Sequence, residues 1–271
     1  MPARQIDHLV ITVPDLAHAA AEFEALGFKL TPKAEHPWGT SNRLVQFADQ
    51  SFLEILTLDR PHLLFEHDPA QSPPIFSFGA YNRDFLARGL SGLSMCAFQG
   101  HDSRADVERF RKASLETFQP FDFGRKATLP DGRQVDVGFS LAFARVPKAP
   151  DTVLFTCHNR FPENFWKPAF QEHPNGATGL GALWFVSEAP AAFTSCFEGV
   201  IDSKATTTHA DHITIPAGRH TVELVTQKAL SKAIPGAHVA PASSPRLQAF
   251  SVRGLKRRDT TAAGGTLLAF L

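Results

Sequence analysis

The chain has 271 residues, of which 43% are hydrophobic and 20% charged, and its 27 basic and 27 acidic side chains give a formal net charge of zero. This composition is typical of a globular protein of one large or two small domains. A net charge of zero gives no bulk attraction to nucleic acid, and the one basic cluster, 256–258, is too short to indicate more than a solvated loop.

Apolar runs stay below the roughly 18 residues of a membrane span, and MPARQIDHLV lacks the features of an export signal. We therefore expect a cytoplasmic protein without a membrane partner. The cysteines Cys96, Cys157 and Cys196 are odd in number and far apart, which favours buried thiols over disulfides or a CxxC metal site. The 24 phenylalanines against one tyrosine suit a core or the wall of an apolar pocket.

The predicted elements begin with a strand at 5–13. Asp15 follows as the N-cap of a helix, and Gly27 stands where a helix C′ glycine belongs. The runs RLVQFA and SFLEILTL predict adjacent antiparallel strands. With a short strand around Phe28–Leu30, residues 5–57 have the order strand, helix, strand, strand, strand.

The same order returns at 90–160. LSMCAFQGHD predicts a strand whose Asp102 caps the next helix, and a long hairpin turns at Pro130-Asp131-Gly132. TVLFTCHN, at 152–159, is the last predicted strand. His8 precedes Asp15 by seven residues and Met95 precedes Asp102 by seven, a spacing that indicates an internal repeat.

A third copy is fainter. GALWFVSEA predicts a strand, PAAFTSCFE a short helix ending at Gly199, and THADHITIPA and RHTVELVT two further strands. LQAFSVRGL and TLLAFL predict a shortened fourth unit without a proper helix. We therefore expect a domain at 1–170 made of two paired modules, 5–57 and 90–160, and a degenerate second pair at 171–271.

These residues resemble a known family. IDHLVITVPDL, followed by GTSNRLVQF and FLEIL, is similar to the opening module of the vicinal oxygen chelate superfamily. FGRKATLPDG, HNRFPENFW and FQEHPNGA resemble its glyoxalase-like branch. The resemblance extends from residue 5 to about 226 and is poor beyond.

The resemblance implies an α+β fold in which tandem βαβββ modules pair into half-open barrels. Members include glyoxalase I, extradiol dioxygenases, methylmalonyl-CoA epimerase, fosfomycin-resistance enzymes and metal-free bleomycin-binding proteins. Because these activities differ, the fold fixes no single reaction, and the function must be argued from the site.

The family takes its metal ligands from the first and last strands of paired modules. His8 matches the first-strand position of module one and Glu54 its last-strand position. In module two these positions fall on Met95, a poor ligand for a hard cation, and on His158. The resemblance therefore implies a divalent ion (Fe²⁺, Zn²⁺, Mn²⁺ or Ni²⁺) held by His8, Glu54 and His158, with open coordination sites.

A physical argument supports this site independently. Glu54 lies between Leu53 and Ile55, so its side chain points opposite theirs, and a carboxylate facing an apolar barrel interior needs a partner. Two imidazoles and a cation would supply one, and Glu54 could double as the catalytic base. The alternatives stay open for each residue taken alone: a core or surface histidine, and a glutamate that faces solvent.

Five further residues are candidates for substrate binding. Trp38 and Asn42, in HPWGTSNR, either line the pocket or build a turn. Arg125 either anchors a substrate carboxylate or phosphate through its planar fork or is an exposed strand-end side chain. Trp166 is a packing anchor or a pocket wall, and His173, in the turn-forming HPNG, is a base or a turn residue.

Glu223 stands at the last-strand position of the third module, but the matching first strand, around Leu180, offers no ligand. A second metal site is therefore not expected. Phosphate-binding loops, a GxSxG elbow and an HExxH helix are missing from the sequence. We expect a metal-dependent enzyme with lyase, isomerase or dioxygenase chemistry on a small substrate. The sheet edge left open by the shortened fourth module favours a homodimer. The alternative is a non-catalytic protein that sequesters a hydrophobic or aromatic compound.

Overall fold

The structure is a computed structural model that describes residues 3–128, 132–235, 244–254 and 259–270. The basic cluster at 256–258 and most of the predicted hairpin turn at 130–132 lie outside these residues. The described strands form two sheets, one from the first part of the chain and one from the second.

The first sheet has the strand order β2-β3-β4-β1-β5-β9-β8-β6, and β7 pairs with β8 beside this path. Its strands are β1 (Ile6–Thr12), β2 (Ala34–Glu35), β3 (Thr40–Gln46), β4 (Phe52–Leu58), β5 (Gly92–Gln99), β6 (Glu116–Thr117), β7 (Phe121–Thr128), β8 (Gln134–Arg145) and β9 (Val153–Asn159).

The centre of this sheet joins the two modules. β1 runs parallel to β4 and antiparallel to β5, and β5 runs parallel to β9. Alternate residues of β1 point to opposite faces: Leu9 and Ile11 join the main core, whereas Val10 joins the aromatic cluster on the concave face. The predicted pairing of two βαβββ modules is confirmed.

The second sheet has the order β11-β12-β13-β10-β14-β16-β15. Its strands are β10 (Gly179–Val186), β11 (Thr207–His209), β12 (His212–Ala217), β13 (His220–Val225), β14 (Arg246–Arg253), β15 (Thr260–Ala263) and β16 (Thr266–Phe270). β10 pairs parallel with β13 and antiparallel with β14, as β1 pairs with β4 and β5. This sheet therefore repeats the arrangement of the first.

The α-helices are α1 (Leu16–Ala25), α2 (Phe78–Ala87), α3 (Ser103–Lys112), α4 (Pro162–Phe165), α5 (Thr194–Ile201) and α6 (Gln227–Ala233), and 3₁₀ turns occupy Pro61–Leu63, Pro168–Phe170 and Pro190–Phe193. The predicted caps of α1 and α3 are confirmed: Asp15 and Asp102 each accept hydrogen bonds from two backbone N–H groups of the first turn. Gly27 follows α1 with a φ of 81°.

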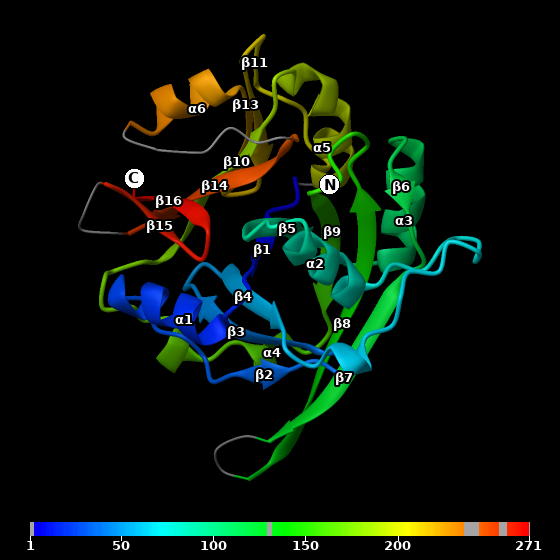
Figure 1. The fold of residues 1–271 in the computed structure, drawn as a ribbon, viewed down its shortest axis with the longest axis vertical. Coiled ribbons are helices and arrows are strands. Elements are labelled where there is room, and N and C mark those ends of the chain that lie inside the picture. Colours follow the sequence, from blue (N-terminus) through cyan, green and yellow to red (C-terminus); the bar gives the residue numbers. More distant parts are fainter. Residues whose placement is uncertain (1–2, 129–131, 236–243, 255–258, 271) are drawn as a thin grey trace.

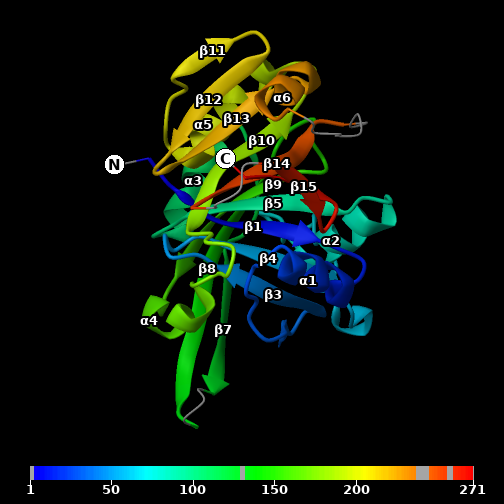
Figure 2. The same cartoon turned by 90° about the vertical axis from the view of Figure 1, so that its left-hand side faces the viewer.

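One hydrophobic core joins the two sheets. Phe23 of α1, Phe110 of α3 and Phe197 of α5 are fully buried in it together with side chains of both sheets. Figures 1 and 2 show the second sheet lying above the first, while the β7–β8 hairpin projects from the opposite side of the molecule. Because the core is shared, the two halves stabilise each other.

Two predicted details are wrong. Residues 28–30 form no strand: Thr31 bonds Leu44 of β3, and the ladder then breaks at Pro32, which has no N–H, before pairing resumes at Ala34–Glu35. The third helix does not end at Gly199 but runs on to Ile201.

Gly199 serves a packing role instead. A Cβ at this position would collide with the Cβ of Ala113, directly after α3, so the missing side chain lets α5 approach that helix. Asp202 then ends α5 in the left-handed region and pairs with Arg109 of α3 at 2.6 Å.

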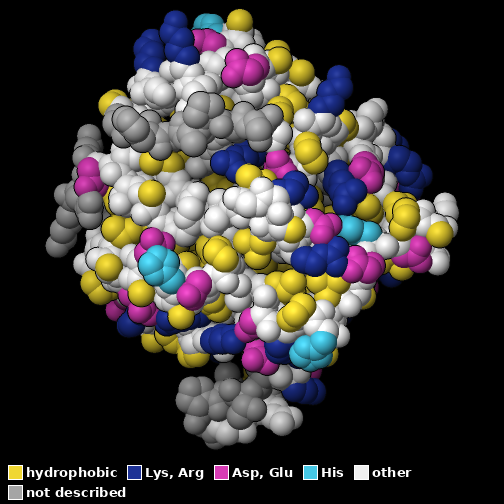
Figure 3. Space-filling view, viewed as in Figure 1, with side chains coloured by type: hydrophobic (Ala, Val, Ile, Leu, Met, Phe, Trp, Pro, Cys, Tyr) yellow, Lys and Arg dark blue, Asp and Glu magenta, His cyan; other side chains and the backbone are white. Residues whose placement is uncertain are grey.

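Helices α2, α4 and α6 and strands β6 and β15 were not predicted. Within the described residues, no helix is long and apolar enough to cross a bilayer. The face of the molecule in Figure 3 shows basic and acidic side chains interspersed, in keeping with the zero net charge. All three cysteines are buried and free, as predicted.

Candidate functional site

The concave face of the first sheet holds a cavity of about 820 Å³, which we call the aromatic cavity. This volume lies within the usual range for a site that binds a small molecule. Its wall is mostly apolar, with eight phenylalanines: Phe52, Phe78, Phe121, Phe123, Phe139, Phe155, Phe165 and Phe170. Of the two uses that the sequence left open for its phenylalanines, a core and a pocket wall, the structure shows both.

Strand alternation explains which side chains reach the cavity. Residues two apart on a strand share a face, so Phe52 and Glu54 of β4 both line it, as do Phe155 and Cys157 of β9. The β7–β8 hairpin extends the wall beyond the sheet. The intervening residues, such as Leu53, belong to the core behind the sheet.

His8 enters the cavity from β1. Its Nδ1 lies 2.6 Å from Oδ1 of Asp7, and since a carboxylate only accepts, Nδ1 carries a hydrogen, an arrangement that in the neutral ring leaves Nε2 with its lone pair. The ring stacks on Phe52 with centroids 4.3 Å apart and meets the edge of Phe155. A register shift between Ile6 and His8 allows the neighbouring Asp7 side chain to reach the same imidazole.

Glu54 faces His8 from the adjacent strand, with Oε2 3.8 Å from Nε2 of His8. Its other oxygen accepts a hydrogen bond of 2.6 Å from Nδ2 of Asn42. That bond fixes the amide orientation and leaves the buried Oδ1 of Asn42 without a partner among the described residues. A carboxylate and an imidazole thus meet in an apolar wall, and the metal-binding role expected of these two residues stays a prediction.

His36 was missed by sequence reasoning. It precedes β3, stacks on Trp38 at 4.7 Å, and its Nδ1 lies 2.8 Å from the Thr40 hydroxyl. Its Nε2 lies 3.9 Å from Oε1 of Glu54. Burial lowers the pKa of His36, and the nearby Arg125 acts in the same direction. The signal was present in HPWG, where the tryptophan was recognised but the histidine two residues before it was not.

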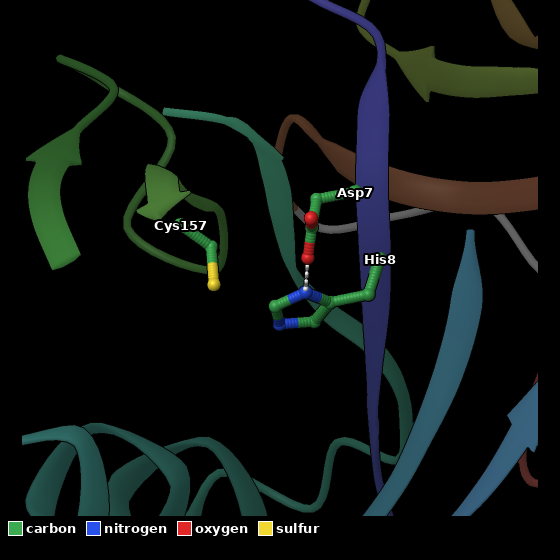
Figure 4. A group of neighbouring side chains, drawn as sticks. All are labelled: Asp7, His8 and Cys157. Atoms are coloured by element: carbon green, nitrogen blue, oxygen red, sulfur yellow. Dashed lines mark hydrogen bonds and ion pairs between the residues drawn. The ribbon is translucent and has the colours of Figure 1, made fainter. Parts of the chain in front are cut away.

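Cys157 lies close to Asp7 and His8. One candidate ligand atom from each of the three lies within 4.8 Å of the others, the one such group found among the described residues. Figure 4 shows Cys157 and His8 extending from separate strands toward a common space, with Asp7 bonded to the imidazole. Burial, followed by the charges of Asp7 and Glu54, raises the pKa of the Cys157 thiol well above its usual range.

His158, the third predicted metal ligand, is not brought to this group. It follows Cys157 on β9, so its side chain points to the opposite face, where its ring lies 6.4 Å from that of His101. It is not among the residues that line the cavity. Met95 is buried in the aromatic cluster of the concave face and supplies no imidazole or carboxylate.

Three of the five predicted substrate-binding residues line the cavity: Trp38, Asn42 and Arg125. The buried Nε1 of Trp38 has no hydrogen-bond partner within the described ranges. Trp166 is not in the lining, and its ring packs against Phe52 and Phe165.

His173 lies outside the cavity and ties the connector between the sheets to the first module. Its Nε2 donates to the carbonyl of Gln46 at 2.8 Å, and its Nδ1 accepts from the backbone N–H of Lys29 at 3.0 Å. Both ring nitrogens are therefore occupied by backbone groups. Burial lowers the pKa of this imidazole, which suits the neutral form that these two bonds require.

The second sheet carries a related pair. His212 donates to Oε2 of Glu223 at 2.7 Å, and Thr214 donates to the same oxygen. Glu223 lies opposite Trp184 of β10 in the strand register, the position equivalent to that of Glu54, which lies opposite Val10 of β1. A cluster around Trp184, including Leu230 of α6, packs on this side of the sheet.

Comparisons with known proteins agree with this architecture. The family model described as a glyoxalase-like domain matches residues 6–201. No curated protein matches the sequence.

Among solved structures, a hypothetical protein from Staphylococcus aureus is 10% identical and has a TM-score of 0.70 over 99% of both chains. A mutant of 4-hydroxymandelate synthase from Streptomyces coelicolor is 14% identical, with a TM-score of 0.57 over 93% of this chain and 71% of that one. The Mn(II)-bound glyoxalase from Novosphingobium aromaticivorans is 12% identical, with a TM-score of 0.50 over 92% and 66%. At these identities the likeness shows the fold alone.

Proposed function

Because the chain belongs to the glyoxalase-like domain family, we propose that it is a metal-dependent enzyme of the vicinal oxygen chelate type, acting on a substrate bound through adjacent oxygens. The observation that carries the proposal is the approach of His8 Nε2 to Glu54 Oε2, 3.8 Å apart in the wall of an apolar cavity. Lyase, isomerase and dioxygenase chemistry all fit such a centre.

The residues present fit a divalent cation. Two ligand atoms at 3.8 Å can share one ion at about 2.0–2.2 Å from each. Asp7 accepts a hydrogen bond from Nδ1 of His8 and so holds the ring with Nε2 toward the cavity, as carboxylates commonly do for metal-binding histidines. The unpaired Oδ1 of Asn42 would accept a hydrogen bond from a water or substrate hydroxyl at the centre.

His8 and Glu54 would therefore hold the ion, and Cys157, whose sulfur lies within 4.8 Å of candidate ligand atoms of Asp7 and His8, is a further group of the required kind. The glyoxalase neighbour is named as Mn(II)-bound, which favours a cation of the Mn²⁺, Fe²⁺, Zn²⁺ or Ni²⁺ class here. Such a cation supplies Lewis-acid stabilisation of negative charge on substrate oxygens.

The chain's own residues would supply the rest of the chemistry. Phe52 and Phe155 exclude water from the His8 ring, which strengthens electrostatic interactions in the cavity. Glu54, held in place by Asn42, can accept a proton from substrate. His36, kept neutral because burial lowers its pKa, is a second group able to do so on the other side of Glu54.

The test is metal content after purification without chelator. Wild type should bind near one equivalent of a divalent metal, and His8→Ala should lose it. His158→Ala is the matched control, because His158 lies on the outer face of β9 and its loss should leave the metal in place. Metal lost from both variants, or absent from wild type, would contradict the proposed centre.

The rival function is a non-catalytic protein that sequesters an apolar compound, and the phenylalanine-rich wall favours it. This function predicts tight retention of an aromatic ligand in metal-free protein and no turnover with metal supplied. A metal-free wild type that retains such a ligand would select it over the enzyme.

A further inference from the structure

We propose that the aromatic cavity takes an elongated, apolar ligand with one anionic group, and that Arg125 binds this group at the end of the cavity remote from His8 and Glu54. Such a ligand would be the substrate class of the proposed enzyme. This rests on the proposed function, since the His8–Glu54 end is taken as the reacting end.

The sheet register separates the two ends. On β8, Leu141 lies opposite Cys157, the neighbour of His8, whereas Val137 lies opposite Arg125. The four residue-to-residue steps from Val137 to Leu141 span about 13 Å, at about 3.3 Å per residue. A ligand that meets both ends must therefore extend along the strand, although the reach of the arginine side chain shortens the span it has to cover.

The charge at the remote end is available for a ligand. Within the described part of the chain, Arg125 makes no hydrogen bond or ion pair, although it lines the cavity. The acids of the lining are engaged elsewhere: Glu35 lies 2.9 Å from Arg60, and Glu54 accepts from Asn42. The cavity thus has a cation at this end without an acidic partner.

The surface between the ends is aromatic. Phe121 and Phe123 lie on the same face of β7 as Arg125. Both rings make T-shaped contacts with the ring of Trp38, with centroids 5.3 Å and 4.9 Å apart. Phe139 stacks with Phe123 across the hairpin. This surface would bury an apolar body, while the planar guanidinium suits a carboxylate, sulfonate or phosphate through paired hydrogen bonds.

Two dyes of matched shape test the inference: anilinonaphthalene sulfonate, an apolar anion, and N-phenylnaphthylamine, its neutral counterpart. Both are titrated by fluorescence into the full-length protein in the presence of chelator. Arg125→Ala should weaken binding of the sulfonate about tenfold, the loss of one charge-assisted contact, and leave the neutral dye within about twofold.

Lys126→Ala is the control, because Lys126 is the next residue of the same strand and pairs with Asp136 at 2.7 Å. It should leave both dyes unaffected, and unchanged binding of the neutral dye shows that the cavity is intact. The inference is overturned if Arg125→Ala weakens both dyes equally or neither. Since no metal is needed, this result is independent of whether the proposed metal centre exists.

Discussion

The two sheets share one strand arrangement but differ in the side chains that it brings together. Each places a glutamate on the strand parallel to its central strand, Glu54 in the first and Glu223 in the second. Glu54 lies opposite Val10, and His8 stands two residues before Val10. Glu223 lies opposite Trp184, and the residue two positions before Trp184 is Ala182. An imidazole on the central strand therefore faces the glutamate in the first sheet alone, whereas in the second sheet Glu223 is bonded to His212 of β12.

The concave faces differ in the same way. The first is bounded by a projecting hairpin and encloses the aromatic cavity. On the second, α6 packs against the sheet, with Leu230 and Ile234 beside Trp184. The difference shows that a repeated module provides positions for a site, and that the residues at those positions, with whatever covers them, decide whether a site forms.

The largest expected effect compares the two glutamates directly. Glu54→Gln should lower metal affinity by more than about 100-fold, since it removes a group that would bind the ion directly, and loss of a residue that only holds a ligand in place already costs about 10–100-fold. Glu223→Gln should leave metal affinity unchanged, because Glu223 is already bonded to His212 and Thr214. Competition with a chelating dye measures the metal affinity of both variants. An equal loss of affinity in the two would contradict a metal site confined to the first sheet.

The second prediction compares the filled face with the open one. Leu230→Ala removes a fully buried side chain of α6 and should lower the free energy of unfolding by about 2–5 kcal/mol. Phe123→Ala, in the half-exposed cavity wall, should cost about 1 kcal/mol through lost ring contacts. Urea unfolding followed by circular dichroism measures both, and a larger loss for Phe123 would show that the cavity wall is packed as core.

The smallest expected effect concerns the connector between the sheets. Because burial lowers the pKa of His173 below its ordinary value of 6.5, the unfolded chain binds a proton near that pH while the folded chain does not. The contribution of His173 to stability is therefore present above about pH 6.5 and is lost as the pH falls below it.

His173→Gln removes this titration. When the pH is lowered from about 7 to below about 6.5, the variant should therefore lose less unfolding free energy than wild type. Unfolding free energies across that range, measured in urea, give the comparison. Identical slopes for the two proteins would show that the imidazole titrates alike in the folded and unfolded chains.

Local pattern was sufficient for much of this molecule. Alternating apolar residues predicted β1, β3 and β4, and the capping residues Asp15 and Asp102 predicted where α1 and α3 begin. Those signals act over a few residues, so they can be read without the fold. The inward orientation predicted for Glu54 followed in the same way, from the opposite direction of Leu53 and Ile55.

The tertiary structure decided what depends on distant segments. Strand pairing, not local pattern, determined that Cys157 rather than its neighbour His158 faces the cavity. His36 reaches Glu54 only because β3 pairs with β4. The sequence by itself determined the modules and brought forward two groups of the proposed centre; long-range packing determined which further side chains stand beside them, since the face that a strand turns inward is set by the strands next to it.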